Sequence, residues 1–189
     1  MWTAYFYMAI YTGARPEEMI GANWSDLKNN VFHIAHGAER IKGVGTVRTP
    51  APKTASSIRD VVLPDDVMQL LQQWKEEQAS YRSRFGNDWA EPDAMFTGDL
   101  GKRLDLSTPT QKFQKILKAN NLRHIKLYSL RHTCASILIA SGRDIRSVAD
   151  LLGHSTPSLT LKTYSHSFDK TKQENANALS AAIAAARKK

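Results

Sequence analysis

Four polar side chains late in the chain have types and spacings that suit phosphate chemistry. They are Tyr128, Arg131, His154 and Tyr164. An arginine offers a planar fork of N–H donors that fits phosphate oxygens, and a histidine can add a further donor. A tyrosine hydroxyl held among phosphate-binding groups is a candidate nucleophile. We therefore expect this part of the chain to form a site for phosphoryl transfer.

Three short helices are predicted to position these residues. Ser129 is expected to cap the first helix, which ends at Gly142. Asp144 is expected to cap the second, which ends at Gly153, next to the histidine. Pro157, preceded by a threonine, has the chemistry of the first turn of a third helix, which would carry the later tyrosine. The helix ends would then bring the arginine and the histidine towards that tyrosine.

The order of these residues resembles the second conserved box of the tyrosine recombinases, the phage integrase family. That box contains His-x-x-Arg, then Leu-Gly-His, then Tyr, and this chain has LRHT, LLGHS and TYSH in the same order. The partner arginine of the family matches Arg15, in TGARPEE at residues 12–18. The hairpin lysine of the family matches Lys53, in KTASSIRDVVLP at residues 53–64. The likeness extends over residues 11–166.

The resemblance implies a site-specific DNA recombinase, or integrase, of the kind that mobile genetic elements use. Tyr164 would attack a backbone phosphate of double-stranded DNA, form a 3′-phosphotyrosyl link and leave a free 5′ hydroxyl. Arg15 and Arg131 would neutralise charge on the phosphate. His154 would donate to the phosphate or help to deprotonate the tyrosine, and Lys53 would protonate the departing oxygen. Because the tyrosyl link keeps the phosphodiester energy, no ATP, cofactor or metal is implied.

Tyr128 departs from the family pattern, in which a histidine commonly stands three residues before the second arginine. Tyrosine can donate one hydrogen bond to a phosphate oxygen, but it carries no positive charge at neutral pH. We expect an accessory donor at this catalytic position. Two alternatives stay open, namely a packed aromatic ring at a helix start and Tyr128 itself as the nucleophile.

Glu18 also has two interpretations. It could be an ion-pair partner that holds an arginine in place, or an ordinary acid in the first turn of the helix that begins near Pro16, where the helix dipole favours negative charge. The family pattern favours the ion pair.

The composition agrees with an anionic partner but does not establish one. The 189 residues carry a net charge of +8, which favours nucleic acid as a partner and equally fits a basic soluble enzyme. The single cysteine, Cys134, excludes a disulfide framework within the chain and a cysteine-based zinc site, and its apolar surroundings predict a buried structural thiol. No stretch reaches the roughly 18 apolar residues that a membrane helix needs, and we expect a cytoplasmic protein.

The hydrophobic pattern predicts a mainly α fold with a small antiparallel β-sheet (α+β). Residues 31–34 and 57–63 predict two strands joined by a long exposed turn. The clearest helix extends from residue 65 to about residue 84. Its apolar face is assigned to the core and consists of Val67, Leu70, Leu71, Trp74, Tyr81 and Phe85.

We expect residues 1–168 to form the catalytic domain and residues 169–189 a helical tail. The family usually carries a smaller DNA-binding domain ahead of this point, and the sequence therefore has the character of a fragment that lacks it. The tail has a narrow apolar stripe that suits contact with a neighbouring protomer, and the resemblance implies a tetramer assembled on DNA. The stripe consists of Ala176, Leu179, Ile183 and Ala186.

Two other functions remain open at this point. A type IB topoisomerase uses a related set of tyrosine, arginines, lysine and histidine, although the LLGHS and TGAR contexts favour a recombinase. A sequence-specific DNA-binding module without chemistry would not need the aligned tyrosine and both arginines.

Overall fold

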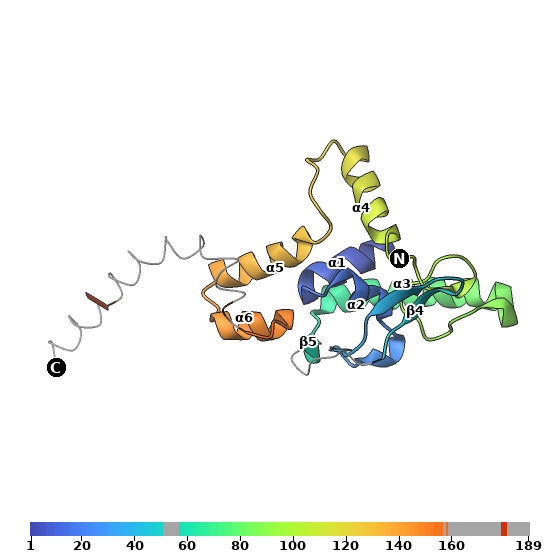
Figure 1. The fold of residues 1–189 in the computed structure, drawn as a ribbon, viewed down its shortest axis with the longest axis horizontal. Coiled ribbons are helices and arrows are strands. Elements are labelled where there is room, and N and C mark those ends of the chain that lie inside the picture. Colours follow the sequence, from blue (N-terminus) through green and yellow to red (C-terminus); the bar gives the residue numbers. More distant parts are fainter. Residues whose placement is uncertain (51–56, 157, 159–178, 181–189) are drawn as a thin grey trace.

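The computed structural model describes residues 1–50, 57–156, 158 and 179–180 (Figure 1). The described part is mainly helical with two small antiparallel sheets, as the sequence predicted. The helices are α1 (Trp2–Thr12), α2 (Pro16–Gly21), α3 (Asp65–Phe85), α4 (Thr108–Ala119), α5 (Ser129–Ala140) and α6 (Ile145–Leu152). The strands are β1 (Leu27–Lys28), β2 (Val31–Ile34), β3 (Ala38–Ile41), β4 (Gly45–Arg48) and β5 (Arg59–Val62).

Helix α1 lies in the core between α3 and α5. It is apolar on most sides, and its Tyr5 and Met8 are fully buried. The helix ends at Gly13, which has a left-handed φ of +57°. A Cβ atom at Gly13 would lie only 2.7 Å from Leu152 Cδ2, so a glycine is needed here for its backbone and for its size. The chain after α1 therefore passes directly against the end of α6.

The main sheet has the strand order β1-β2-β5 and is antiparallel throughout. Phe32 of β2 pairs with Val61 of β5, and both side chains are buried. Both predicted strands are therefore confirmed. The prediction of a long exposed turn between them was wrong in part, because β3 and β4 form a separate hairpin there. Gly43 and Gly45 adopt positive φ angles that allow the tight reversal, and little of the hairpin is buried, so the sequence pattern of a buried face is missing.

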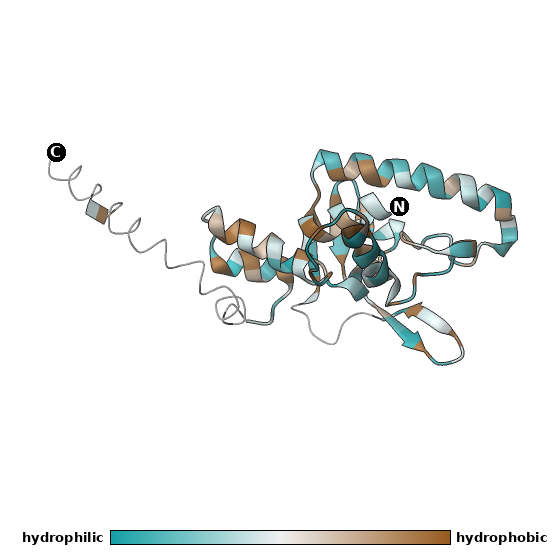
Figure 2. Ribbon diagram, turned by 90° about the horizontal axis from the view of Figure 1, so that it is seen from above, coloured by the Kyte–Doolittle hydropathy of each residue, from teal (hydrophilic) through white to brown (hydrophobic). Residues whose placement is uncertain are grey.

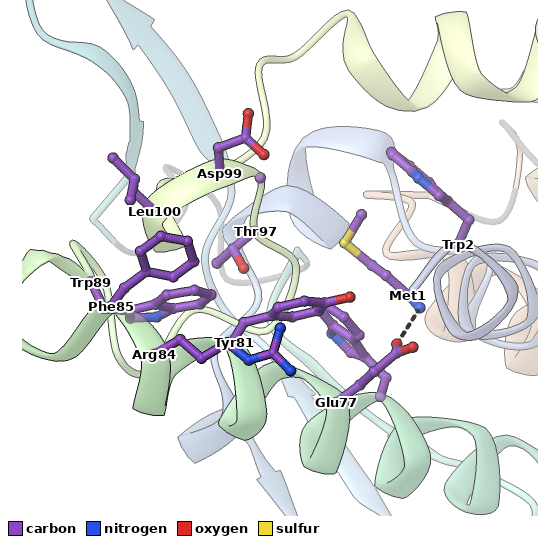
Figure 3. A pocket seen from close by; sticks show the side chains of 12 residues that line it. Met1, Trp2, Glu77, Tyr81, Arg84, Phe85, Trp89, Thr97, Asp99 and Leu100 are labelled. Atoms are coloured by element: carbon purple, nitrogen blue, oxygen red, sulfur yellow. Dashed lines mark hydrogen bonds and ion pairs between the residues drawn. The ribbon is translucent and has the colours of Figure 1, made fainter.

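Helix α3 is the longest helix among the described residues, and hydrophilic residues predominate along it (Figure 2). Val67, Leu71 and Trp74 are buried in the core, as predicted. Tyr81 and Phe85 are each 43% exposed, so their assignment to the core was wrong. The C-terminal turns of α3 extend past the main core and border an open cleft of about 600 Å³ (Figure 3). The cleft is also lined by Trp2, Trp89 and Leu100.

The predicted start and end of α6 are confirmed, and the predicted cap of α5 is not. Asp144 caps α6, because its Oδ1 accepts a hydrogen bond from the backbone N–H of Ser147 (2.9 Å). α6 ends at Gly153, with a left-handed φ of +66°. Ser129 does not cap α5. Its backbone N–H instead donates to the carbonyl of Lys126 (2.9 Å), so α5 continues from a turn that has already formed.

None of the helices in the described ranges has both the length and the apolar character required to cross a lipid bilayer.

Candidate active site

Arg15 is held at the start of α2 by Glu18. The backbone N–H of Arg15 donates to Glu18 Oε2 (2.8 Å), and its Nη1 donates to Glu18 Oε1 (2.7 Å). Pro16 occupies the first turn, where the missing N–H costs nothing. The ion-pair interpretation of Glu18 is therefore confirmed, and the same carboxylate also caps the helix.

Arg131 enters the site from the first turn of α5 and is only 2% exposed. Its Nη1 donates to the carbonyl of Gly13 (2.6 Å), and its Nη2 donates to the carbonyl of Leu152 (2.6 Å). The guanidinium thus connects the end of α1 to the end of α6. Burial lowers the pKa of Arg131, and the nearby charge of Arg15 lowers it further, although an arginine stays charged at neutral pH. The position of this charge is fixed before any ligand binds.

The C-terminal end of α6 gathers positive charge. Its last carbonyls carry the negative end of the helix dipole, which favours cations. Three successive carbonyls each accept a hydrogen bond from a different arginine. Arg59 Nε donates to Leu151 (2.6 Å), Arg131 Nη2 donates to Leu152 (2.6 Å) and Arg15 Nη2 donates to Gly153 (3.2 Å).

His154 directly follows these carbonyls, and its backbone N–H donates to the carbonyl of Ala149 (3.0 Å). Partial burial of the imidazole lowers its pKa, and the charges of Arg131, Arg15 and Arg59 lower it further, to about 4. The imidazole is therefore neutral at pH 7. A neutral imidazole has one N–H donor and one acceptor nitrogen, so it can donate to a phosphate oxygen or accept a proton from a hydroxyl.

We expect the imidazole of His154 to titrate near pH 4 in the DNA-free chain. Because the folded pKa lies below the unfolded value of 6.5, stability from this group is present above pH 6.5 and is lost as the pH falls towards 4. Nitrogen-15 NMR of the histidine side chains measures this midpoint, and His154→Gln assigns the resonance. A midpoint near 6.5 would show that the arginine charges do not converge on His154.

Tyr128 is the residue that immediately precedes α5 and is 41% exposed. Its ring meets the ring of His132 edge-on, with the centroids 5.1 Å apart. Tyr128 therefore packs against its own helix on one side while much of its surface stays open. Two other predicted site residues, Lys53 and Tyr164, lie outside the described residues.

Arg59 is a site residue that the sequence interpretation missed. It lies at the start of β5 and points to the same buried side of the strand as Val61. Its Nη2 donates to Glu18 Oε2 (2.8 Å) and its Nη1 donates to Glu18 Oε1 (3.2 Å). The signal in the sequence was an arginine at an inward position of the alternating pattern, because such a residue requires a buried partner.

Cys134 is buried on α5, and burial raises the pKa of its thiol, as expected for a structural cysteine. Within the described ranges, no group of three or more His, Cys, Asp or Glu side chains is arranged to hold a metal ion.

The fold belongs to a known class. It is that of the catalytic domain of tyrosine recombinases. The integrase of the Tn1549 transposon, solved in complex with circular intermediate DNA, superposes with a TM-score of 0.77. The two sequences are 22% identical, and the alignment covers 93% of this chain and 59% of that one. The sequence itself matches the Phage integrase family over residues 2–171, and the chain therefore belongs to that family.

Two curated relatives are similar to this chain in sequence. A tyrosine recombinase XerC-like protein from Caldanaerobacter subterraneus subsp. tengcongensis is 29% identical over 181 residues, which cover 89% of this chain and 46% of that protein. The ICEBs1 integrase of Bacillus subtilis is 27% identical over 180 residues, which cover 95% of this chain and 48% of that protein. The chain thus spans about half the length of the curated relatives it matches.

Proposed function

We propose that the chain is the catalytic part of a site-specific recombinase that cleaves and rejoins double-stranded DNA through a phosphotyrosyl link on Tyr164. One observation carries the proposal. Arg15 and Arg131, which are separated by most of the sequence, meet at the end of α6 beside His154. These are three residues that the family motifs assign to the scissile phosphate.

The arrangement suits a transition state in which negative charge grows on the non-bridging oxygens of a phosphate. Both arginines are fixed by carbonyl or carboxylate partners, so little reorganisation is needed when that charge develops. A preorganised donor of this kind can contribute on the order of 3 kcal/mol to the barrier. Tyr128 would add an accessory donor at the edge of the same site.

The proton steps balance without a further reactant. The Oη atom of Tyr164 attacks the phosphorus and loses its proton, and the bond from phosphorus to the 5′ oxygen breaks. A phenol with a pKa of about 10 is mostly protonated at neutral pH, so an acceptor is needed. Neutral His154 can take that role or donate to the phosphate, and Lys53 would supply the proton to the 5′ oxygen. Rejoining reverses each transfer.

The proposal is tested with a pool of nicked duplexes of randomised sequence. Cleavage near the nick releases the short piece between the cleavage site and the nick, which carries the free 5′ hydroxyl, so the adduct cannot rejoin and accumulates. We expect a protein–DNA adduct that survives denaturation, forms without added ATP or metal, and yields an enriched sequence when the bound DNA is read. Duplexes of that sequence should then exchange strands pairwise. Relaxation of supercoiled DNA without strand exchange would indicate a topoisomerase instead, and binding without an adduct would indicate a non-catalytic module.

We propose further that residues 1–168 are the catalytic domain and that residues 169–189 dock on a neighbouring copy, as part of a tetramer on DNA. A groove of about 620 Å³ between α1 and α5 supports this. Its lining is almost entirely apolar and partly exposed. It consists of Phe6, Tyr7, Ile10, Tyr11, Leu130, Cys134, Ile137, Leu138 and Leu151.

Deletion of residues 170–189 should impair the pairing of two DNA sites more than cleavage by a single subunit. Two point variants give matched tests of the two sides of this contact. Ile137→Glu in the groove and Leu179→Glu in the tail should each reduce pairing, which a gel-shift assay of two-site complexes measures. Lys115→Glu on the exposed side of α4 serves as the control. Pairing that is intact in the deletion variant would show that the tail makes no contact between protomers.

A further inference from the structure

The guanidinium of Arg59 joins three segments that are distant in sequence. Its two Nη atoms bind Glu18 of α2, and its Nε donates to the carbonyl of Leu151 at the end of α6 (2.6 Å). Its Nη1 also donates to the carbonyl of Ser57, just ahead of β5 (3.0 Å). One side chain thus connects the helix that follows Arg15 to the helix end that precedes His154.

The pair of Arg59 and Glu18 is deeply buried, with side-chain exposures of 6% and 9%. Burial alone would raise the pKa of Glu18, but the hydrogen bond and charge of Arg59, followed by those of Arg15, outweigh it and lower the pKa. Glu18 is therefore ionised and shared between the two arginines. Without Arg59, the carboxylate would lose two of its donors and would be free to turn away from Arg15.

Arg59 also packs on the backbone that leads to His154. A Cβ atom at Gly153 would lie 2.8 Å from Arg59 Nη1, and the φ of Gly153 is +66°. The glycine is thus required both for the left-handed turn and for the close approach of this guanidinium. The position of the carbonyl that accepts from Arg15 is therefore tied to the position of Arg59.

We infer that Arg59 is a positioning residue of the recombinase site, which holds Glu18 and the end of α6 so that Arg15 and His154 face the same phosphate. The inference rests on the proposed function. Arg59 acts through its neighbours, because both ends of its guanidinium are bound to protein groups. It also fixes the start of β5, the strand that Lys53 precedes by six residues in the sequence.

The test compares Arg59→Gln and Arg59→Lys with Arg84→Gln, an exposed arginine at the end of α3. Single-turnover cleavage at saturating DNA gives the rate, and binding to uncleaved duplex gives the affinity. We expect Arg59→Gln to lower the rate by about 100-fold, the scale of one lost charge-directing contact, while affinity changes by less than about threefold. Arg59→Lys should recover only part of the rate, because an ammonium cannot bind the Glu18 carboxylate and the Leu151 carbonyl in one plane.

A double-mutant cycle with Glu18→Gln identifies the route of the effect. If Arg59 acts through Glu18, the double variant should lose little more than the worse single variant. Additive losses, or a wild-type rate in a folded Arg59→Lys variant, would overturn the inference. If Arg59→Gln does not fold, the cleavage rate of Arg59→Lys and its double-mutant cycle with Glu18→Gln test the inference instead.

A readout without DNA separates this inference from the proposed function. In the DNA-free chain, Arg59→Gln should raise the pKa of His154, because the charge of Arg59 is one of those that lower it. Arg84→Gln should leave that pKa unchanged, because Arg84 is not among the charges that act on this imidazole. Failure of the wild-type chain to form any adduct would defeat the proposed function alone. An unchanged His154 titration in Arg59→Gln would defeat the positioning role of Arg59.

Discussion

Tyr164→Phe should abolish covalent attachment of the chain to DNA while leaving DNA binding close to unchanged. The substitution removes only the hydroxyl oxygen, which is the atom that would bond to phosphorus. That hydroxyl contributes little to holding the DNA backbone, because backbone contacts are shared among many basic groups. Denaturing gels of a labelled suicide duplex measure the adduct, and a gel shift under native conditions measures binding.

Tyr128→Phe is the matched control for this prediction. It makes the same chemical change at a tyrosine that we expect to be an accessory donor, so the adduct should still form. The rate should fall by the equivalent of about 1–2 kcal/mol, the scale of one hydrogen bond to a charged group. An adduct that persists in Tyr164→Phe and disappears in Tyr128→Phe would reverse the two roles.

The second large effect is expected for Arg131→Ala. The variant removes a charge directed at the transition state, so cleavage should slow by about 10²–10³-fold, far more than affinity falls. It should also destabilise the fold, because the carbonyls of Gly13 and Leu152 lose their donor. Each buried carbonyl that is left unsatisfied costs about 1–3 kcal/mol. Single-turnover cleavage, DNA binding and chemical denaturation measure the three quantities.

Arg15→Ala separates the catalytic effect from the structural one. Its side chain is 27% exposed and contacts a single carbonyl, so we expect a similar loss of rate with a smaller loss of stability. Lys115→Ala, at an exposed position of α4, should change neither the cleavage rate nor the stability. Equal losses of rate and affinity in the two arginine variants would mean that they bind the DNA backbone and do not act on the transition state.

Local signals in the sequence fix the backbone around Arg15 and His154. Pro16 begins α2 directly after Arg15, Asp144 begins α6, and Gly153 ends α6 directly before His154. Each signal acts within one turn of backbone, so it can be read without the rest of the fold. The convergence of the two arginines and the histidine depends on tertiary contacts and was supplied by the family motifs.

Two of the features that were missed depend on distant parts of the chain. Arg59 is buried because Glu18 is there to pair with it, and that contact spans 41 residues. Tyr81 has the apolar spacing of a core residue, but α3 continues past the core that would have buried it. The expected cap at Ser129 failed for a local reason, because the turn that begins at Lys126 places Ser129 inside the first turn of α5.

The most direct test of the account is to map the peptide that carries the DNA. After trapping on a suicide duplex, nuclease and trypsin digestion should leave a nucleotide remnant on residues 163–170, the tryptic peptide TYSHSFDK, with fragmentation placing it on Tyr164. The other candidate, Tyr128, lies in LYSLR at residues 127–131, so mass spectrometry separates the two without ambiguity. A remnant on Tyr164 is the predicted result. A remnant on Tyr128, or on no tyrosine, would contradict the assignment of the whole site.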